Sequence, residues 1–415
     1  MPLNPECLQL SPEEMARYSR HITLPHIGKE GQRRLKMARV VIIGLGGLGS
    51  PAALYLAAAG VGKLGLAEWD TVEATNLQRQ ILYDNGQLGL PKLDAAAARL
   101  RALNPHCVVQ RHPEGFNVEN AHELCDLYDL IVDGSDNFPT RYLVNDAAWL
   151  SRKPLVYGSL SQFEGQIAFF DFTTRRAGNS RALNTPCLRC LFPKIPAPGT
   201  VPNCAEAGVF GALCGTIGSL QAMEVIKYVT GAGEVLRSRL LAVEALEPRF
   251  RILNVKQDPQ CSLCGANPRI QEITAVNYAW KGCRQVSSRP NDVSNEEGTQ
   301  ESALNDASTL PIETSVEKAK AWLESEQPPL LLDVREPFET EICRLTDSVS
   351  IPLTHLAERL DGLPKERPIL VYCHHGMRSM RAVGLLHSKG YAQAVNLAGG
   401  IDAWAVTLDP SMQRY

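Results

Sequence analysis

The alternation of apolar and polar positions predicts two α/β regions. From about residue 39 to residue 250, short apolar runs alternate with segments of helical period, a pattern that indicates a doubly wound sheet with helices on both faces. The runs that predict strands are Val40–Ile43, Leu64–Ala67, Leu130–Asp133 and Leu155–Tyr157. We therefore expect one large, doubly wound α/β domain.

A second, smaller α/β pattern follows a polar segment. Residues 285–309 are rich in Ser, Asn, Glu, Pro and Gly, which is typical of a solvated linker. Beyond this segment we expect helices at Val316–Glu326 and Ser379–Lys389, and strands at Leu330–Val334, Ile369–Tyr372 and Ala394–Leu397. The predicted domains are residues 1–284 and 311–415, joined by a linker at 285–310.

Composition narrows the class of protein. The 415 residues carry a formal net charge of -3, which gives no general attraction to nucleic acids or anionic membranes, so we expect neither as a partner. The first residues have neither the basic nor the apolar stretch of a signal peptide, which predicts a cytoplasmic protein. The 12 cysteines should then stay mostly reduced and serve as ligands, nucleophiles or small buried side chains.

A glycine-rich turn after the first predicted strand indicates a nucleotide site. The turn reads Gly44-Leu45-Gly46-Gly47-Leu48-Gly49, and a helix is expected from Ser50 until Gly60. Glycines let the backbone approach a phosphate, and the helix N-terminus presents free N–H groups. The strand, the G-x-G-x-x-G turn and the helix together predict a Rossmann-like phosphate site at Gly44, Gly46 and Gly47, with a purely structural tight turn as the alternative.

Charged residues beyond the glycines distinguish ATP from NAD. Glu68, with Asp70 close by, lies about 20 residues past the glycines, where a carboxylate can hydrogen-bond the ribose of either nucleotide. Asn76 and Arg79 follow in one short segment and Lys92 in another, and the two basic side chains supply charge that a triphosphate needs. The sequence therefore favours ATP, with ordinary surface charge as the alternative for either basic residue.

Two further polar residues follow the predicted strand Leu130–Asp133. Asp136 and Asn137 come at the carboxyl edge of the sheet, where open α/β folds bind their ligands. We expect Asp136 to hold Mg²⁺ on the phosphates. The alternative is an Asx turn or a helix cap formed by either residue.

These motifs, with Arg17-Tyr18-Ser19-Arg20, resemble the MoeB/ThiF adenylyltransferases, relatives of the ubiquitin-activating enzymes, over about residues 10–270. The resemblance implies MgATP as the nucleotide and a homodimer in which Arg20 reaches into the partner's active site. The family usually has Asp at the position of Glu68, and Glu can make the same hydrogen bonds to ribose.

Two C-x-x-C pairs predict a zinc site in the first domain. Cys187 with Cys190 and Cys261 with Cys264 can bring four thiolates to one tetrahedral Zn²⁺, which would staple distant segments of the chain. Unrelated pairs or a redox pair are the alternatives. The matching cysteines of the MoeB/ThiF family bind a structural zinc, so the resemblance implies the same role.

Cys204 lies between these pairs in a glycine-rich stretch, where a thiolate could reach an acyl adenylate. A small buried side chain is the alternative. In the eukaryotic-type relatives that carry a rhodanese domain, the matching cysteine is linked covalently to the carrier, so the resemblance implies a catalytic role.

A second reactive cysteine is expected in the smaller domain. Cys373 heads the loop Cys373-His374-His375-Gly376-Met377-Arg378-Ser379 between a strand and a helix, where converging N–H groups favour a thiolate. Phosphotyrosine phosphatases use a similar C-x5-R-[ST] cradle, and a phosphatase is the alternative. The segments 332–337 and 396–404 resemble rhodanese signatures over about residues 311–415, which implies sulfur transfer through a Cys373 persulfide.

The combined reading is an ATP-dependent enzyme of sulfur transfer, of the MoeZ or MOCS type. It would adenylate the C-terminal glycine of a small ubiquitin-like sulfur carrier ending in Gly-Gly and then form the carrier thiocarboxylate. A cysteine desulfurase or thiosulfate would supply the sulfur. We expect the pathway to be molybdenum cofactor biosynthesis, with thiamine, cysteine or tRNA thiolation as alternatives. The other function classes considered are a non-catalytic carrier-binding scaffold and an NAD-dependent oxidoreductase fused to a phosphatase.

Overall fold

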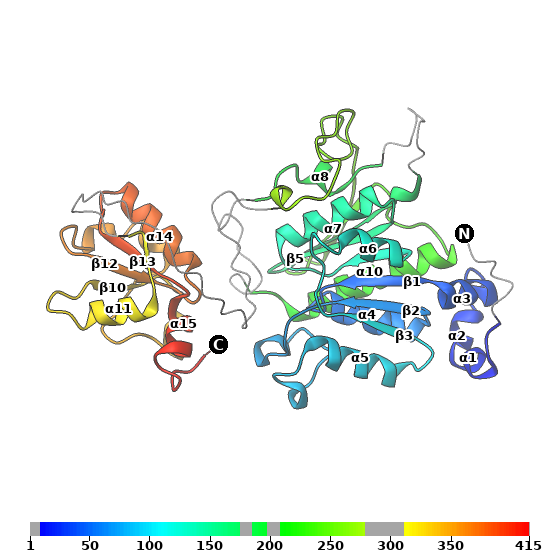
Figure 1. Cartoon of the computed structure of the whole chain (residues 1–415), viewed down its shortest axis with the longest axis horizontal. Helices are drawn as coiled ribbons and strands as arrows, with labels where there is room; N and C mark the ends of the chain where they lie inside the picture. Colours follow the sequence, from blue (N-terminus) through cyan, green and yellow to red (C-terminus); the bar gives the residue numbers. More distant parts are fainter. Residues whose placement is uncertain (1–8, 175–184, 197–207, 279–310, 415) are drawn as a thin grey trace, which may run out of the picture. The chain divides into compact units, whose positions relative to one another are not determined.

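The chain divides into two compact units, Met1–Gln285 and Val286–Tyr415 (Figure 1). The computed structural model describes residues 9–174, 185–196, 208–278 and 311–414. The predicted linker at 285–310 lies outside the described residues. Each unit contains its own sheet and its own hydrophobic cores, so each is described separately.

The first unit is built on an eight-stranded sheet of order β3-β2-β1-β4-β5-β6-β7-β8. Its strands are β1 (Arg39–Ile43), β2 (Lys63–Ala67), β3 (Val108–His112), β4 (Leu130–Asp133), β5 (Leu155–Ser161), β6 (Glu164–Phe170), β7 (Arg239–Glu244) and β8 (Arg249–Asn254). The first five are parallel and the last three are antiparallel. The parallel part confirms the predicted Rossmann-like doubly wound sheet.

Helices cover both faces of this sheet because side chains alternate along each strand. On β1, Val40 and Ile42 pack into one core, and Val41 and Ile43 pack into the other. The first core contains α3 (Gly28–Met37), α4 (Gly49–Ala59), α5 (Lys92–Leu103) and α10 (Gly211–Thr230). The second contains α6 (Ala121–Leu127), α7 (Phe138–Leu150) and α8 (Leu188–Leu191).

The long helix α10 carries only two charged residues, Glu224 and Lys227. It packs against α4, β5 and β6 and ends at Gly231, whose φ of 78° suits a glycine. Among the described residues, no helix has both the length and the apolar character needed to cross a membrane.

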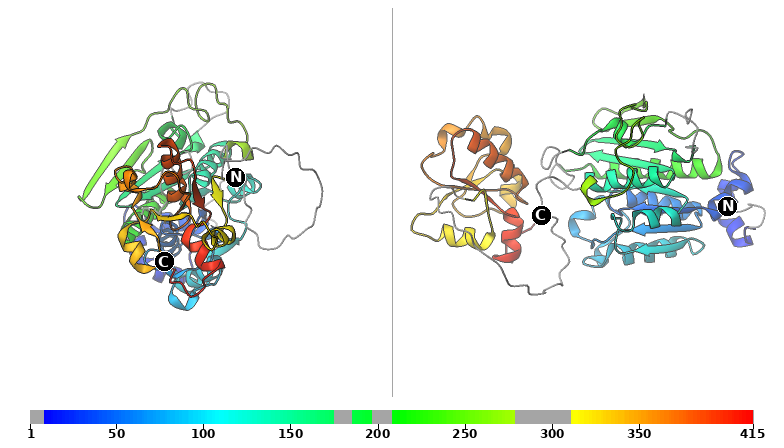
Figure 2. Two further views of the ribbon diagram at one scale, coloured as in Figure 1. Left: turned by 90° about the vertical axis from the view of Figure 1, so that its left-hand side faces the viewer. Right: turned by 45° about the horizontal axis from the view of Figure 1, so that its top comes forward.

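The second unit has a five-stranded parallel sheet of order β11-β10-β12-β13-β9, with helices on both faces (Figure 2). The strands are β9 (Glu313–Thr314), β10 (Leu330–Asp333), β11 (Val349–Ser350), β12 (Ile369–Tyr372) and β13 (Ala394–Leu397). One face carries α13 (Leu353–Leu356) and α14 (Met377–Ser388), and the other carries α11 (Val316–Leu323) and α15 (Gly400–Thr407). The smaller α/β domain is confirmed, although α11 ends three residues before the predicted boundary at Glu326.

Candidate active sites

The glycine turn joins β1 to α4 as the sequence predicts. Gly44 has φ +82°, and a Cβ there would lie 3.0 Å from the carbonyl oxygen of Gly134. A Cβ on Gly49 would come within 1.9 Å of the Gly44 oxygen, so no other residue fits. Among the described residues, a Cβ on Gly46 would meet only a Gln80 side-chain nitrogen, at 3.8 Å, so there is open space beside this glycine. Gly47 has a different reason to be glycine, since its Cβ would lie 2.9 Å from the Cys214 sulfur.

Glu68 is buried beneath this turn and braces it. Its Oε2 accepts a hydrogen bond of 2.9 Å from the Leu45 N–H, and its Oε1 accepts from the N–H groups of Trp69 at 2.9 Å and Asp70 at 3.1 Å. Both carboxylate oxygens therefore bind backbone in this structure, and the ribose contact stays a prediction.

Lys92 and Arg79 lie at the same end of the sheet. The Lys92 ammonium donates to Asp70 Oδ2 at 2.6 Å, and its side chain is only 5% exposed. Arg79 donates to the Thr75 carbonyl at 3.0 Å, and its Cδ is 3.5 Å from where a Cβ on Gly47 would be. The structure thus places Arg79 beside the glycine turn and pairs Lys92 with Asp70, whose N–H donates to the bracing carboxylate of Glu68.

The other polar candidates have distinct local roles. Asn76 is buried in a short 3₁₀ helix, where its Oδ1 accepts a 3.4 Å hydrogen bond from the Glu73 N–H. Asn137 caps α7 by accepting from the Thr140 N–H at 3.0 Å, which is the capping alternative of the sequence reading. Asp136 is exposed beside this cap and free to meet a ligand.

Arg20 is not near the glycine turn of its own chain. It lies on α2 (Ser19–Ile22), next to Tyr18, whose ring packs on Gly60 and whose hydroxyl accepts from Asn104. Gly60 ends α4 whereas the glycine turn begins it, and 11 residues of helix span about 16 Å. Arg20 is exposed at that far end. Within one chain, the structure therefore places Arg20 away from the glycine turn.

The four predicted ligands of the cysteine site do meet. The sulfurs of Cys187, Cys190, Cys261 and Cys264 all lie within 4.8 Å of one another. Cys187 and Cys261 are 3.6 Å apart and Cys190 and Cys264 are 3.2 Å apart, close to the ~3.8 Å between sulfurs around a tetrahedral zinc.

The donor set of this cluster fits a thiophilic divalent cation. Burial raises the pKa of the Cys187 thiol well above its usual value, which a bound cation would reverse. Backbone N–H groups point at two of the sulfurs, from Asp258 to Cys190 at 3.3 Å and from Cys264 to Cys261 at 3.5 Å. Such contacts are typical of metal-bound thiolates.

Cys204 lies outside the described residues, and the described chain resumes at Gly208.

Cys373 lies in a loop that is built around its sulfur. The Sγ accepts from the Gly376 N–H at 3.1 Å and from the Ser379 hydroxyl at 3.3 Å. Gly376 has φ +90°, and a Cβ there would be 3.1 Å from the Gly399 nitrogen. The N-terminal turn of α15 closes the loop, because the Ile401 N–H donates to the Cys373 carbonyl at 2.9 Å.

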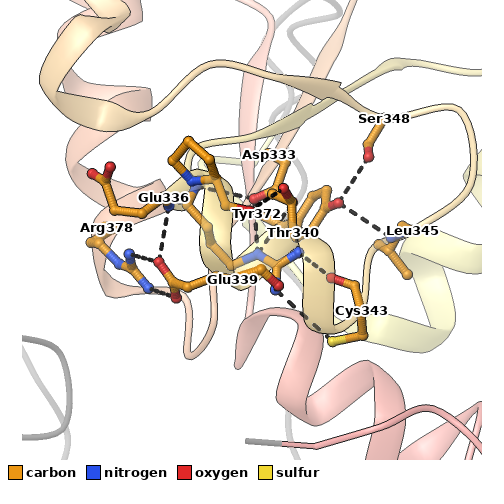
Figure 3. Close-up of polar contacts among 11 residues, drawn as sticks. Asp333, Glu336, Glu339, Thr340, Cys343, Leu345, Ser348, Tyr372 and Arg378 are labelled. Carbon is orange, nitrogen blue, oxygen red and sulfur yellow. Dashed lines mark hydrogen bonds and ion pairs between the residues drawn. The ribbon is translucent and has the colours of Figure 1, made fainter.

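The arginine of this loop is bound to a carboxylate. Figure 3 shows Arg378 paired with Glu339, with nitrogen–oxygen distances of 2.5 and 2.6 Å. Only four residues separate Cys373 from Arg378, one fewer than the phosphatase cradle has. The phosphatase alternative therefore loses both its spacing and its free cation.

Sequence reasoning missed several buried charged residues near these sites. Asp133 and Arg141 flank the Asp136 turn, and Asp146 binds Arg189, which lies between two of the clustered cysteines. Glu339, the partner of Arg378, lies three residues after Glu336. The two residues form a capping box at the N-terminus of α12 (Pro337–Ile342). That E-x-x-E spacing was a usable signal, whereas Asp146 and Arg189, which lie 43 residues apart, gave none.

Comparisons with known proteins agree with this geometry. The ThiF family model matches residues 18–263, and the rhodanese-like domain model matches residues 315–407. The chain is 41% identical over its full length to the probable adenylyltransferase/sulfurtransferase MoeZ of Mycobacterium tuberculosis, covering 98% of that protein. It is 39% identical to the adenylyltransferase and sulfurtransferase MOCS3 of Drosophila ananassae, over 98% of this chain and 87% of that protein.

A shorter relative matches about two thirds of this chain. A sulfur carrier protein adenylyltransferase of Thermus thermophilus is 52% identical over 266 residues, 64% of this chain and 96% of the relative. The chain belongs to the family of adenylyltransferase/sulfurtransferases, in which a ThiF domain is followed by a rhodanese-like domain.

Proposed function

We propose that this enzyme activates a small ubiquitin-like sulfur carrier and converts its C-terminal glycine into a thiocarboxylate. The observation that carries the proposal is the pairing of two sites in one chain. One unit places a glycine turn beside Asp136, Arg79 and the Lys92–Asp70 pair, and the other surrounds the Cys373 sulfur with hydrogen-bond donors. The name of the Thermus relative supports a sulfur carrier as the substrate.

The first step is adenylation at the glycine turn. A carboxylate oxygen of the carrier attacks the α-phosphorus of ATP, and the bond to the β-phosphate breaks to release pyrophosphate. N–H groups at the start of α4 and the cations of Arg79 and Lys92 stabilise the charge that builds on the phosphates. Asp136 would hold Mg²⁺, which neutralises phosphate charge when bound.

The second step is sulfur transfer. The terminal sulfur of a Cys373 persulfide attacks the acyl carbon and displaces AMP, which leaves an acyl disulfide. A second thiolate, for which we propose Cys204, attacks the Cys373 sulfur and frees the carrier thiocarboxylate. The resulting Cys204–Cys373 disulfide needs two electrons from an external thiol before the next turnover.

The proposal includes assembly and context. A homodimer would bring Arg20 to the partner's phosphates, and this accounts for its position far from the glycine turn of its own chain. Zn²⁺ would occupy the four-cysteine cluster as a structural ion. A cytosolic location suits thiols that must stay reduced. We propose molybdenum cofactor biosynthesis as the pathway and a cysteine desulfurase or thiosulfate as the sulfur source.

The test separates the two steps with two variants. With purified carriers ending in Gly-Gly, the wild type should catalyse carrier-dependent ATP–pyrophosphate exchange and, given a persulfide donor, form thiocarboxylate that mass spectrometry detects. Asp136→Ala should lose both activities, whereas Cys373→Ala should lose only the second. Cys343→Ala, in the same unit as Cys373, is the matched control and should keep both. Normal thiocarboxylate formation by Cys373→Ala would refute the relay, and absence of exchange with every carrier would favour the scaffold alternative.

A further inference from the structure

The turn that carries Asp136 packs on a buried carboxylate, that of Asp133, which has no part in the proposed reaction steps. Asp133 ends β4 and is fully buried. Its Oδ1 accepts from the Ser135 N–H at 3.0 Å and from the Ser135 hydroxyl at 2.6 Å, while no described residue partners its Oδ2. A carboxylate in such a place costs stability unless a nearby cation compensates it.

Arg141 is the compensating cation. It lies in the first turn of α7 and is 7% exposed. Its Nε and Nη2 donate to the Ser135 carbonyl at 3.3 and 3.1 Å, and its Nη1 donates to the Ser159 hydroxyl on β5 at 2.9 Å. Burial raises the pKa of Asp133, and the positive charge of Arg141 opposes that rise.

Ser135 is consequently held through its N–H, its hydroxyl and its carbonyl. The position of Ser135 matters because a Cβ on Gly44 would lie 3.2 Å from the Ser135 Cα. The backbone at Ser135 therefore packs directly on the glycine turn. The Gly134 N–H also donates to the Ile43 carbonyl at 2.8 Å. Asp136 is the next residue in the chain. A shift of Ser135 would therefore move Asp136 relative to the glycine turn.

We propose that Asp133 and Arg141 are positioning residues of the adenylation site. Together they form a clamp on Ser135, in which Asp133 binds its N–H and hydroxyl and Arg141 binds its carbonyl, so that Asp136 keeps a fixed distance from the glycine turn. This inference rests on the proposed adenylation function. Neither side chain need touch ATP. If these contacts to Ser135 are lost, the chain should bind MgATP less tightly, because Asp136 and the glycine turn must act together on the phosphates and would no longer be preorganised.

Two variants loosen the clamp to different degrees. Arg141→Lys keeps the charge but loses the forked contact to the Ser135 carbonyl and the link to Ser159. Ser135→Ala removes only the hydroxyl bond to Asp133, so it should fold even if the arginine variant is impaired. The control is Glu224→Gln, which alters a buried carboxylate on α10 that accepts from the Leu236 N–H and pairs with Lys227.

The readouts are direct binding of MgATP by the full chain, the Mg²⁺ concentration that half-saturates binding, and the steady-state constants of carrier-dependent exchange. Arg141→Lys should weaken MgATP binding about tenfold or more, as expected for a lost bond to a charged donor. It should raise KM and the Mg²⁺ requirement together. Ser135→Ala should show a smaller rise of the same kind. Glu224→Gln should lower Tm without either change.

Two outcomes would overturn the inference. One is unchanged MgATP binding and Mg²⁺ dependence in folded Arg141→Lys and Ser135→Ala proteins. The other is an equal weakening in Glu224→Gln, which would indicate a general loss of stability. If the wild type itself gives no exchange, the proposed function fails first, and the binding data still report on the clamp.

Discussion

At the residue scale, the two reactive centres depend on glycines and buried charges that fix a few atoms. In the rhodanese-like domain, Gly376 adopts φ +90° and turns its N–H toward Cys373. Arg378 is neutralised by Glu339, and His374 stacks on His375 with ring centroids 3.9 Å apart. Two neutral donors, the Gly376 N–H and the Ser379 hydroxyl, hydrogen-bond the Cys373 sulfur.

His374 makes the second domain sensitive to acid. Its pKa is lowered to about 4 from 6.5, because burial disfavours the imidazolium and His375 lies against it. Between these values the unfolded chain binds a proton that the folded chain does not, so stability falls as the pH falls from about 6.5 to 4. His374→Gln should flatten this loss in urea unfolding followed at several pH values, while His355→Gln, at an exposed histidine, should not. Identical pH profiles for wild type and His374→Gln would contradict this assignment.

At the element scale, α7 connects the turn that carries Asp136 to the four-cysteine cluster. Its first residues follow the Asn137 cap, and its last turns hold Asn145 and Asp146. Asn145 accepts from the Leu188 N–H at 2.9 Å, and Asp146 binds Arg189 through two bonds of 2.8 and 2.6 Å. One helix thus anchors the segment that supplies the first two cysteines.

Breaking the Asp146–Arg189 pair should lower the stability of the first unit and weaken retention of the zinc ion proposed for the four-cysteine cluster. Both side chains are buried, with Arg189 also over the Tyr142 ring, so Asp146→Asn leaves a buried cation without its partner. Loss of one partner of such a pair costs about 3–5 kcal/mol. The control is Asp94→Asn, which breaks an exposed pair with Arg111 worth less than about 1 kcal/mol. Chemical unfolding and the rate of metal release to a chelator would measure the two effects, and equal behaviour of the variants would exclude the anchor.

The sequence predicted those parts of these elements whose signals are local. The glycine turn, the strands that flank it and the C-x-x-C pairs are each recognisable within a few neighbouring residues, and the structure contains them. The clamp on Ser135 could not be predicted, because Asp133, Arg141 and Ser159 meet only after β4 and β5 pair. Strand β8 was also missed, since all six of its residues are exposed and it lacks the alternation that identifies a half-buried strand.

At the scale of the whole molecule, two chemistries are joined in one chain, each in a unit with its own core. The Thermus relative, named a sulfur carrier protein adenylyltransferase, matches only 64% of this chain. In the proposed reaction, joining the units raises the local concentration of the Cys373 persulfide near the acyl adenylate. Covalent linkage typically supplies an effective concentration in the millimolar range, far above that of separate proteins in a cell.

Separating the two domains should therefore uncouple the steps without abolishing either. Residues 1–284 and 311–415, expressed as two polypeptides whose folding is checked by cooperative unfolding, should retain pyrophosphate exchange and persulfide formation respectively. Thiocarboxylate formation by the mixture should rise with the concentration of the second polypeptide and approach the rate of the intact chain only near ~1 mM. A Cys373→Ala version of the second polypeptide is the control and should contribute nothing. Full activity at micromolar concentrations would instead mean that the domains bind one another tightly, and the covalent connection would then have no kinetic role.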